Sequence, residues 1–106
     1  MTLDYRLKKE KDFNLVFNKG KKLFSSCLTL VYLPSSELKA GFAVSKKHGG
    51  SVKRNRIKRL LREAFRATQQ EMKGTYSIVL LPKVCEEYSF QKYVQHLKWI
   101  IKREKM

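Results

Sequence analysis

Apolar residues recur at helical spacing in three stretches of the chain. In residues 9 to 19, Phe13, Val16 and Phe17 lie at i, i+3 and i+4, and Gly20 follows as a helix stop. In residues 51 to 68, SVKRNRIKRLLREAFRAT, one helical stripe consists of Ile57, Leu60, Leu61, Ala64 and Phe65. The third stretch follows Ser89, a candidate N-cap, and its stripe consists of Phe90, Tyr93, Val94, Leu97 and Ile101, with Trp99 on the opposite side. The pattern predicts three amphipathic helices.

Three other stretches are rich in strand-forming residues. Residues 27 to 33 (CLTLVYL) and 40 to 46 (AGFAVSK) are separated by the polar segment PSSELK, which suits an antiparallel hairpin. Residues 75 to 81 (TYSIVLL) are apolar enough to form a central strand. The predicted order is helix, hairpin with a possible extra strand, helix, strand and helix. This order is typical of an α+β sandwich in which a sheet packs against helices.

The size and charge of the chain narrow its function. With 106 residues and no internal repeat or Pro/Gly/Ser-rich linker, residues 1 to 106 are expected to form one domain. Lys and Arg number 24 against 9 Asp and Glu, which gives a net charge of +15. Such self-repulsion destabilises a compact protein unless a polyanion neutralises it, so the expected partner is nucleic acid. Because 42% of the residues are hydrophobic and 11% aromatic, the chain is expected to fold.

The sequence gives no sign of a membrane or secretory protein. No apolar run approaches the roughly 20 residues that span a bilayer, and Asp4, Glu10 and Asp12 interrupt the N-terminal region where a signal segment would be apolar. We therefore expect a cytoplasmic protein that does not bind membranes. Cys27 and Cys85 have neither a CxxC neighbour nor clustered His, which argues against a zinc site and predicts free buried thiols.

The positive charge is concentrated in residues 46 to 66. This segment has one acid, Glu63, and therefore a net charge of +8 from nine basic residues: Lys46, Lys47, Lys53, Arg54, Arg56, Lys58, Arg59, Arg62 and Arg66. On a helical wheel, Asn55, Arg59, Arg62 and Arg66 face away from the apolar stripe, and Arg54, Arg56 and Lys58 flank it. Cations near a helix N-terminus and like charges at i, i+4 destabilise an isolated helix, and only Arg59 with Glu63 offsets this. A solvated surface usually mixes both signs, so this one-sided charge predicts a phosphate-binding face.

Two aromatic residues and the lack of an acid/base cluster add to this picture. Phe13 and Phe17 lie one turn apart among lysines (Lys8, Lys9, Lys11 and Lys19), a combination that binds single-stranded nucleic acid, although both rings could equally be core. A protein nuclease would need carboxylates for metal ions or a His pair, but Asp4, Glu10 and Asp12 are interleaved with lysines and His48 and His96 are isolated. We expect no catalytic residue and no metal site in this chain.

The segment GFAVSKKHGGSVKRNRIKRLLREAFR, residues 41 to 66, closely resembles the signature region of the bacterial ribonuclease P protein, including its Arg-Asn-Arg motif at residues 54 to 56. RLKKEKDFNLVFNKGKKL, residues 6 to 23, resembles the N-terminal segment of the same family, so nearly the whole chain is covered. The resemblance implies a fold like that of the second domain of ribosomal protein S5. That fold is an α/β sandwich with a left-handed βαβ crossover, where the general rule would predict a right-handed one.

The resemblance also implies a function. Proteins of this family bind the catalytic RNA subunit of ribonuclease P and the 5′ leader of precursor tRNA, and thereby promote the endonucleolytic removal of the leader. Hydrolysis is then expected at the RNA, with Mg²⁺ held there, no cofactor on the protein and no obligate protein partner. By matching positions, the leader contacts would be Phe13, Phe17, Lys46, Asn55, Lys58 and Arg62. The contacts to the catalytic RNA would be Lys53, Arg54, Arg56, Arg59 and Arg66.

One position departs from the family pattern. Position 48 is His where family members often carry an aliphatic residue, and because Gly49 and Gly50 follow it, we expect a loop residue.

Three other classes of function can be compared with the composition. A ribosomal or other structural RNA-binding protein would have the same charge but no preference for precursor tRNA. A standalone RNA-processing enzyme would need the missing acid/base cluster. A membrane-surface protein would need a helix with a large exposed apolar face.

Overall fold

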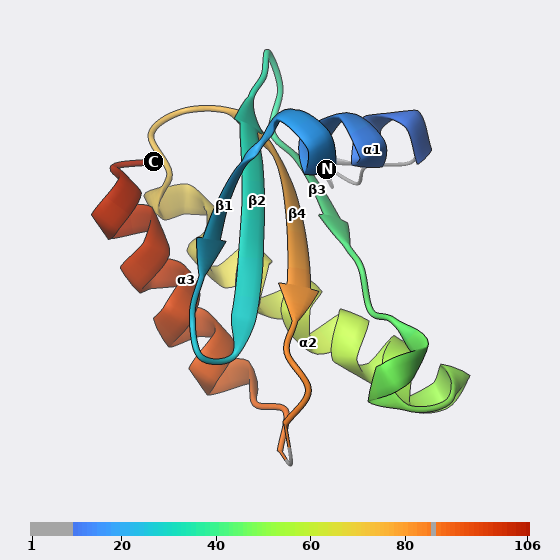
Figure 1. Cartoon of the computed structure of the whole chain (residues 1–106). Helices are drawn as coiled ribbons and strands as arrows, with labels where there is room; N and C mark the ends of the chain where they lie inside the picture. Colours follow the sequence, from blue (N-terminus) through green and yellow to red (C-terminus); the bar gives the residue numbers. More distant parts are fainter. Residues whose placement is uncertain (1–9, 86) are drawn as a thin grey trace, which may run out of the picture.

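The computed structural model describes residues 10–85 and 87–106. Asp4, Lys8 and Lys9, named above, lie outside the described residues. The elements, in chain order, are α1 (Glu10–Lys19), β1 (Lys21–Phe24), β2 (Leu28–Pro34), β3 (Lys39–Phe42), the 3-10 turn η1 (Lys46–His48), α2 (Ser51–Thr68), the 3-10 turn η2 (Gln69–Glu71), β4 (Tyr76–Pro82) and α3 (Phe90–Glu104). Figure 1 shows a four-stranded sheet with α1 on one face and α2 and α3 on the other. The three predicted helices and the α+β class are confirmed.

The strands pair differently from the predicted hairpin. The sheet order is β1-β2-β4-β3, so β4 lies between the two stretches that were expected to pair with each other. β4 is antiparallel to β2 and parallel to β3, and β1 is the extra strand, antiparallel to β2. The physical reason is burial: Ile78, Val79 and Leu80 are fully buried, which only a strand flanked on both sides and covered on both faces achieves. The prediction that this strand is central is confirmed, and the hairpin prediction is wrong.

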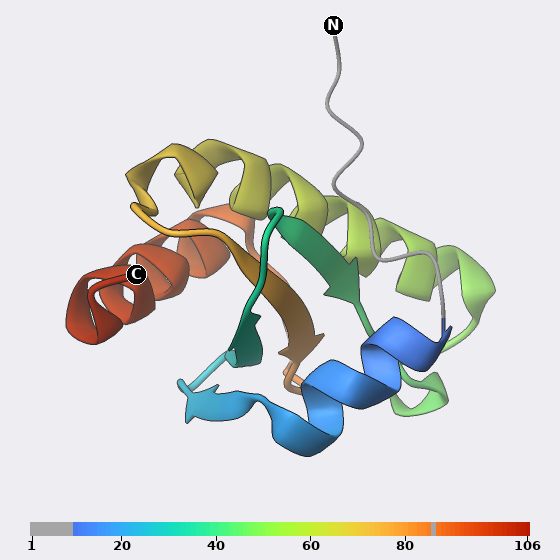
Figure 2. The same cartoon turned by 90° about the horizontal axis from the view of Figure 1, so that it is seen from above.

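The connection from β3 through α2 to β4 is left-handed. β3 and β4 run in the same direction in Figure 1, with β3 to the right of β4, and Figure 2 shows that α2 lies on the far side of the sheet. A path that moves from right to left along downward strands, with its helix behind them, has a left-handed turn. Almost all βαβ units are right-handed, and the family resemblance correctly predicted the exception.

The main core lies between the sheet and the pair α2 and α3. α2 contributes Ile57, Leu61, Ala64 and Phe65, all with at most 1% of their surface exposed. α3 contributes Tyr93, Leu97, Ile100 and Ile101, against Leu30, Ile78 and Leu80 of the sheet. The Ser89 side chain accepts a hydrogen bond from the Lys92 backbone N–H, so the predicted N-cap is confirmed. The predicted apolar stripes therefore bury α2 and α3, except that Phe90 is 38% exposed and Ile100, which was not predicted, is buried; Trp99 remains on the exposed side.

A smaller cluster holds α1 on the other face of the sheet. Val16 is buried against Val31 and Val79, and Phe13 and Phe17 pack on the same cluster. The Phe13 ring lies directly over Gly41 of β3, in the space that a side chain on residue 41 would occupy. Glycine at this position thus allows α1 to approach β3 closely.

The helices and the two cysteines can be compared with the predictions on membrane spans and free thiols. No helix within the described part of the chain is long and apolar enough to cross a membrane. Cys27 is a buried free thiol, as expected, whereas Cys85 is free but only partly buried.

Candidate nucleic-acid interface

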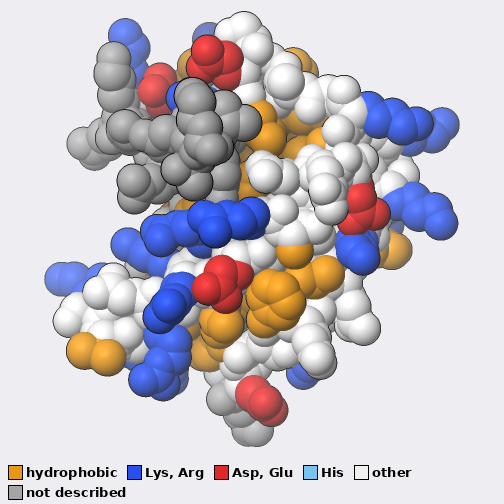
Figure 3. All heavy atoms as spheres, turned by 180° about the vertical axis from the view of Figure 1, so that it is seen from behind, with side chains coloured by type: hydrophobic (Ala, Val, Ile, Leu, Met, Phe, Trp, Pro, Cys, Tyr) orange, Lys and Arg blue, Asp and Glu red, His pale blue; other side chains and the backbone are white. Residues whose placement is uncertain are grey.

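The N-terminal end of α2 concentrates positive charge without any local compensation. The helix begins after Gly50, which provides no side-chain cap, and its first turn contains no acidic residue. Lys53 and Arg54 therefore add their charges to the positive end of the helix dipole. Backbone N–H groups and cations at one helix end favour an anion such as phosphate. Figure 3 shows Lys and Arg side chains gathered over α2 on the left of that view.

Arg54, Lys58 and Arg62 form a half-buried basic row along α2, spaced at i, i+4 and i+8. On the helical wheel this row lies on the same side as Phe65, whose ring meets that of Phe42 at a centroid distance of 6.3 Å. The row therefore borders β3, the edge strand of the sheet. The Nε atoms of Arg54 and Arg62 are buried and have no hydrogen-bond partner among the described residues. Their guanidinium groups are thus partly desolvated, which strengthens any contact with phosphate.

The other predicted contact residues lie on different sides of α2. Asn55, Arg59 and Arg66 are exposed on the outer face, and Arg59 makes an exposed ion pair with Glu63, with 3.6 Å between Nε and Oε1. Lys46 is exposed in η1, before the helix. Lys53 and Arg56 are exposed on the flank opposite the half-buried row, where they line a groove of about 720 Å³ that extends to Tyr88. The structure therefore separates the predicted residues into two flanks and an outer face.

His48 is not the loop residue that the sequence suggested. Only 3% of its surface is exposed, and its Nδ1 lies 2.7 Å from the Tyr88 hydroxyl oxygen, within hydrogen-bonding distance. Burial, together with the charges of Lys47 and Lys53, lowers the pKa of His48, and a hydrogen bond to the Pro82 backbone opposes that shift. A neutral His48 thus joins the segment before α2 to the segment before α3. The Lys53 ammonium lies over the Tyr88 ring, 5.5 Å from its centroid, and extends this contact into α2.

Phe13 and Phe17 are partly buried, and both pack on the small cluster beneath α1. Part of each ring therefore holds α1 on the sheet, which was the alternative considered for them. They lie on the sheet face opposite α2, and β3 links the two sides because Gly41 touches Phe13 while Phe42 touches Phe65. Four of the predicted leader residues, Phe13, Phe17, Lys58 and Arg62, thus lie on the two faces of the sheet near β3, whereas Asn55 faces outward and Lys46 lies in η1.

Sequence reasoning missed two residues that position this region. Gly41 was noted only as part of the family signature, although the contact with Phe13 depends on its missing side chain. Tyr88 was not singled out at all, because a tyrosine in a polar loop gives no periodic signal. Its polar tip contacts His48 and its ring contacts Lys53, both of which flank the start of α2.

The described residues contain no group of three or more His, Cys, Asp or Glu side chains that could hold a metal ion. Glu63, the one acid within α2, pairs with Arg59. The arrangement can bind polyanions through cations and backbone N–H groups, and nothing in it resembles a nucleophile with its base.

A mixed sheet with a left-handed crossover and a basic crossover helix defines a small protein of the α+β class with a surface suited to polyanions. Residues 1–105 match the Ribonuclease P family model, so the chain belongs to the ribonuclease P protein family. The ribonuclease P protein component of Alkaliphilus metalliredigens is 33% identical over 110 residues, which cover all of this chain and 98% of that relative. That of Bacillus velezensis is 38% identical over 98 residues, which cover 87% and 84% of the two chains.

Solved structures agree with this assignment. The ribonuclease P protein of Staphylococcus aureus has a TM-score of 0.82 and 25% identity, with 97% of each chain covered. That of Thermotoga maritima has a TM-score of 0.81 and 28% identity, with 92% of this chain and 96% of that chain covered. The protein thus acts in the removal of the 5′ leader from precursor tRNA, as the protein part of an endoribonuclease whose catalytic chemistry resides in RNA.

Proposed function

We propose that the residues around β3, together with Lys46 of η1 and Asn55 on the outer face of α2, bind the single-stranded leader of precursor tRNA, while Arg54 and the remaining basic residues of the outer face and opposite flank of α2 bind the catalytic RNA. The leader contacts are Phe13, Phe17, Lys46, Asn55, Lys58 and Arg62, and the contacts to the catalytic RNA are Lys53, Arg54, Arg56, Arg59 and Arg66. The protein would act in the cytoplasm, with Mg²⁺ held at the active site of the RNA.

The half-buried basic row is the observation that carries this proposal. Lys58 and Arg62 border the edge strand β3, whose other face contacts Phe13, and Phe17 packs on the neighbouring cluster, so cations and aromatic rings are available on the two faces of the sheet at this edge. Single-stranded nucleic acid is bound by this combination, because phosphates contact the cations and bases stack on the rings. Because both rings pack partly on the small cluster beneath α1, bases stack only on the parts of Phe13 and Phe17 that remain exposed.

Arg54 is the residue whose position fits the proposed division between the two RNAs least well. It was assigned to the catalytic RNA, yet it shares the half-buried row with Lys58 and Arg62. Arg54→Ala should therefore be compared directly with Arg56→Ala, its neighbour on the opposite flank. If Arg54 contacts the catalytic RNA alone, both variants weaken binding of that RNA and neither changes the dependence of precursor affinity on leader length.

The central experiment measures affinity for precursor tRNA over a series of leader lengths, with the RNA subunit present. Affinity should rise as the leader grows from zero to several nucleotides, because only the precursor has a strand that can reach β3. Lys58→Ala should flatten this dependence more than Lys53→Ala, its matched control on the opposite flank. Equal affinity across the whole series would refute the leader site.

Phe17→Ala separates stacking from packing. A stacked base contributes about 1 to 3 kcal/mol, so loss of the ring should reduce the preference for precursor over mature tRNA several-fold. Binding of the RNA subunit should change less. If the main effect is instead a lower melting temperature with the preference intact, Phe17 serves only the small cluster beneath α1.

A further inference from the structure

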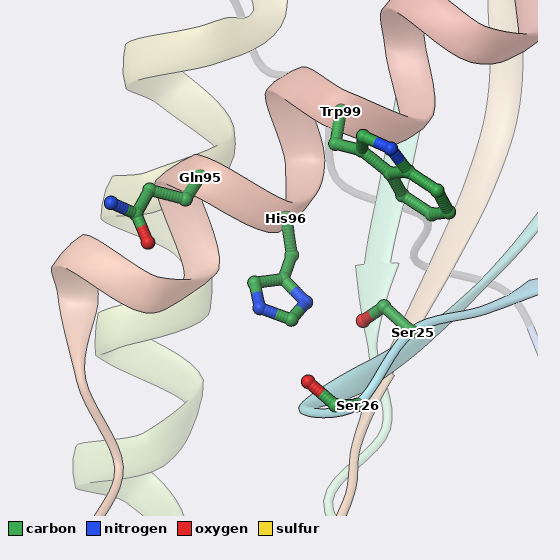
Figure 4. A pocket seen from close by; sticks show the side chains of 5 residues that line it. All are labelled: Ser25, Ser26, Gln95, His96 and Trp99. Carbon is green, nitrogen blue, oxygen red and sulfur yellow. The ribbon is translucent and has the colours of Figure 1, made fainter.

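A second aromatic and basic surface lies on α3, away from the residues discussed above. Trp99 has half of its surface exposed, although a large aromatic ring is usually buried. It lines a hollow of about 300 Å³ with Ser25, Ser26, Gln95 and His96. In Figure 4, Trp99 and His96 project from α3 toward the turn that carries Ser25 and Ser26. This turn joins β1 to β2 at one edge of the sheet, whereas β3 forms the opposite edge.

The hollow continues along α3 as a groove. A second hollow of about 250 Å³ shares Ser26, Gln95 and His96 with the first and extends to Lys92. The buried side chain of Tyr93 also lines it, and the Tyr93 hydroxyl has no hydrogen-bond partner among the described residues. A buried hydroxyl without a partner destabilises the protein, and a polar ligand could relieve this. Small polar groups therefore line a groove that has an exposed aromatic ring at one end.

The charge around this groove indicates what it binds. α3 carries four basic residues, Lys92, Lys98, Lys102 and Arg103, against one acid, Glu104. The negative charge of Glu104 is already paired, because the Lys21 ammonium lies 2.6 Å from the Glu104 carboxylate. This contact lowers the pKa of the carboxyl group, which stays ionised. The Arg103 guanidinium lies 5.1 Å from the centre of the Trp99 ring, a cation–π contact. In Figure 3 a second group of Lys and Arg side chains lies at the right-hand rim, apart from the group over α2.

We propose that the groove along α3 binds an unpaired segment of RNA, with one base stacked on Trp99 and the backbone following Arg103 and Lys92. A base needs a flat aromatic face, which Trp99 provides, and hydrogen-bonding groups at its edge, which Ser26 and Gln95 provide, since the Ser25 hydroxyl already bonds to the Leu28 backbone. Phosphate groups need cations on the rim, and apart from Glu87, at the far end of the groove, its described lining residues are neutral or basic. This site would give the protein a second RNA contact on the edge of the sheet opposite β3.

Trp99 is the only tryptophan in the chain, so its fluorescence reports on this site alone. The full-length protein is titrated at low salt with an eight-nucleotide oligouridylate and, separately, with inorganic polyphosphate, which has the charge but no bases. The oligouridylate should quench the fluorescence in a saturable way, and polyphosphate should not. Quenching should persist in Arg62→Ala, which affects only the leader site proposed above. Equal quenching by polyphosphate would overturn the stacked base, and no quenching by the oligouridylate would overturn the site.

A pair of variants tests the binding energy. Measured by isothermal titration calorimetry in the Arg62→Ala background, which weakens the leader site, Trp99→Ala should weaken oligouridylate binding at least five-fold, as expected for the loss of one stacked base. Phe24→Ala is the matched control, because Phe24 is 64% exposed and lies under a cation, Lys83, at 5.9 Å, but does not line the groove. It should leave the affinity unchanged. Equal losses in both variants would overturn the proposal, and neither variant should alter the dependence of precursor affinity on leader length.

Discussion

Leu61 and Arg62 are adjacent in α2 and face opposite environments, so replacing each with alanine separates folding from RNA binding. Leu61 is fully buried in the main core. Arg62 belongs to the half-buried basic row, with like charges one turn away at Lys58 and Arg66. Leu61→Ala should destabilise the protein, whereas Arg62→Ala should weaken RNA binding.

The magnitudes follow from these surroundings. Because Leu61 is fully buried, removing its side chain leaves a cavity in the core. This cavity should lower the free energy of unfolding by about 2 to 5 kcal/mol. Removing Arg62 relieves about 0.2 to 0.5 kcal/mol of repulsion per like-charged neighbour and eliminates a buried Nε without a partner. It also removes the packing of the Arg62 stem, so the net change should stay within about 0.5 kcal/mol. Arg59→Ala would be harder to interpret, because it also breaks the ion pair with Glu63.

Two measurements on each variant decide the question. Urea unfolding gives the free energy, and binding of precursor tRNA in the presence of the RNA subunit, at several salt concentrations, gives the slope of log affinity against log salt. Each lost phosphate contact should make this slope less steep by about 0.7 to 0.9. Arg62→Ala should show this change with nearly unaltered unfolding, and Leu61→Ala the reverse. If Arg62→Ala unfolds the protein and leaves the salt slope unchanged, Arg62 is structural and the electrostatic interpretation of α2 is wrong.

Three further predictions concern the supports of the site. Gly41→Ala places a methyl group where the Phe13 ring lies and should lower the free energy of unfolding, measured in urea, by about 1 to 3 kcal/mol. If the clash is the cause, the double variant with Phe13→Ala should lose much less stability than the sum of the two single changes. Because burial lowers the pKa of His48 in the folded protein, the unfolded chain binds a proton first as the pH falls below about 6.5. Stability should therefore decrease between pH 6.5 and the lower folded pKa, and His48→Gln, which can still contact Tyr88, should flatten this part of the curve; an unchanged curve would contradict the assignment. Ser89→Ala should lower the free energy of unfolding, measured by urea unfolding, by an amount near the lower end of the range of about 0.5 to 2 kcal/mol for an N-cap, since the bond is long at 3.4 Å, and Ser89→Asp should retain the native value.

Much of the candidate site could be predicted because it rests on local periodicity and charge. Ile57, Leu61 and Phe65 recur at helical spacing, so the buried side of α2 and its basic remainder followed directly from the order of residues. The same holds for Ser89 and the stripe of α3. The resemblance in residues 41 to 66 then supplied the family, which the family model and the curated relatives confirm.

Contacts between distant segments could not be predicted in this way. The position of His48 depends on Tyr88, 40 residues later, and a histidine before two glycines looks like a loop residue until that partner is present. Phe13 and Phe17 were left between core and ligand contact, and only the packing over Gly41 showed that their rings are shared with the core. The wrong hairpin has the same origin, because strand pairing is decided by which strands can be buried together and not by their order in the chain.

The sequence by itself determined the three helices, the central strand, the sign and location of the charge and the family, since each depends on neighbouring residues or on a contiguous motif. Tertiary structure alone decided that β4 separates β2 and β3, that the row of Arg54, Lys58 and Arg62 lies beside β3, and that the turn with Ser25 and Ser26 forms a groove with Trp99 of α3. These features depend on the burial of both faces of one sheet, which brings residues from four or more elements together. A one-dimensional pattern records which side of an element is apolar, but the partner of that side is fixed only when all the elements pack at once.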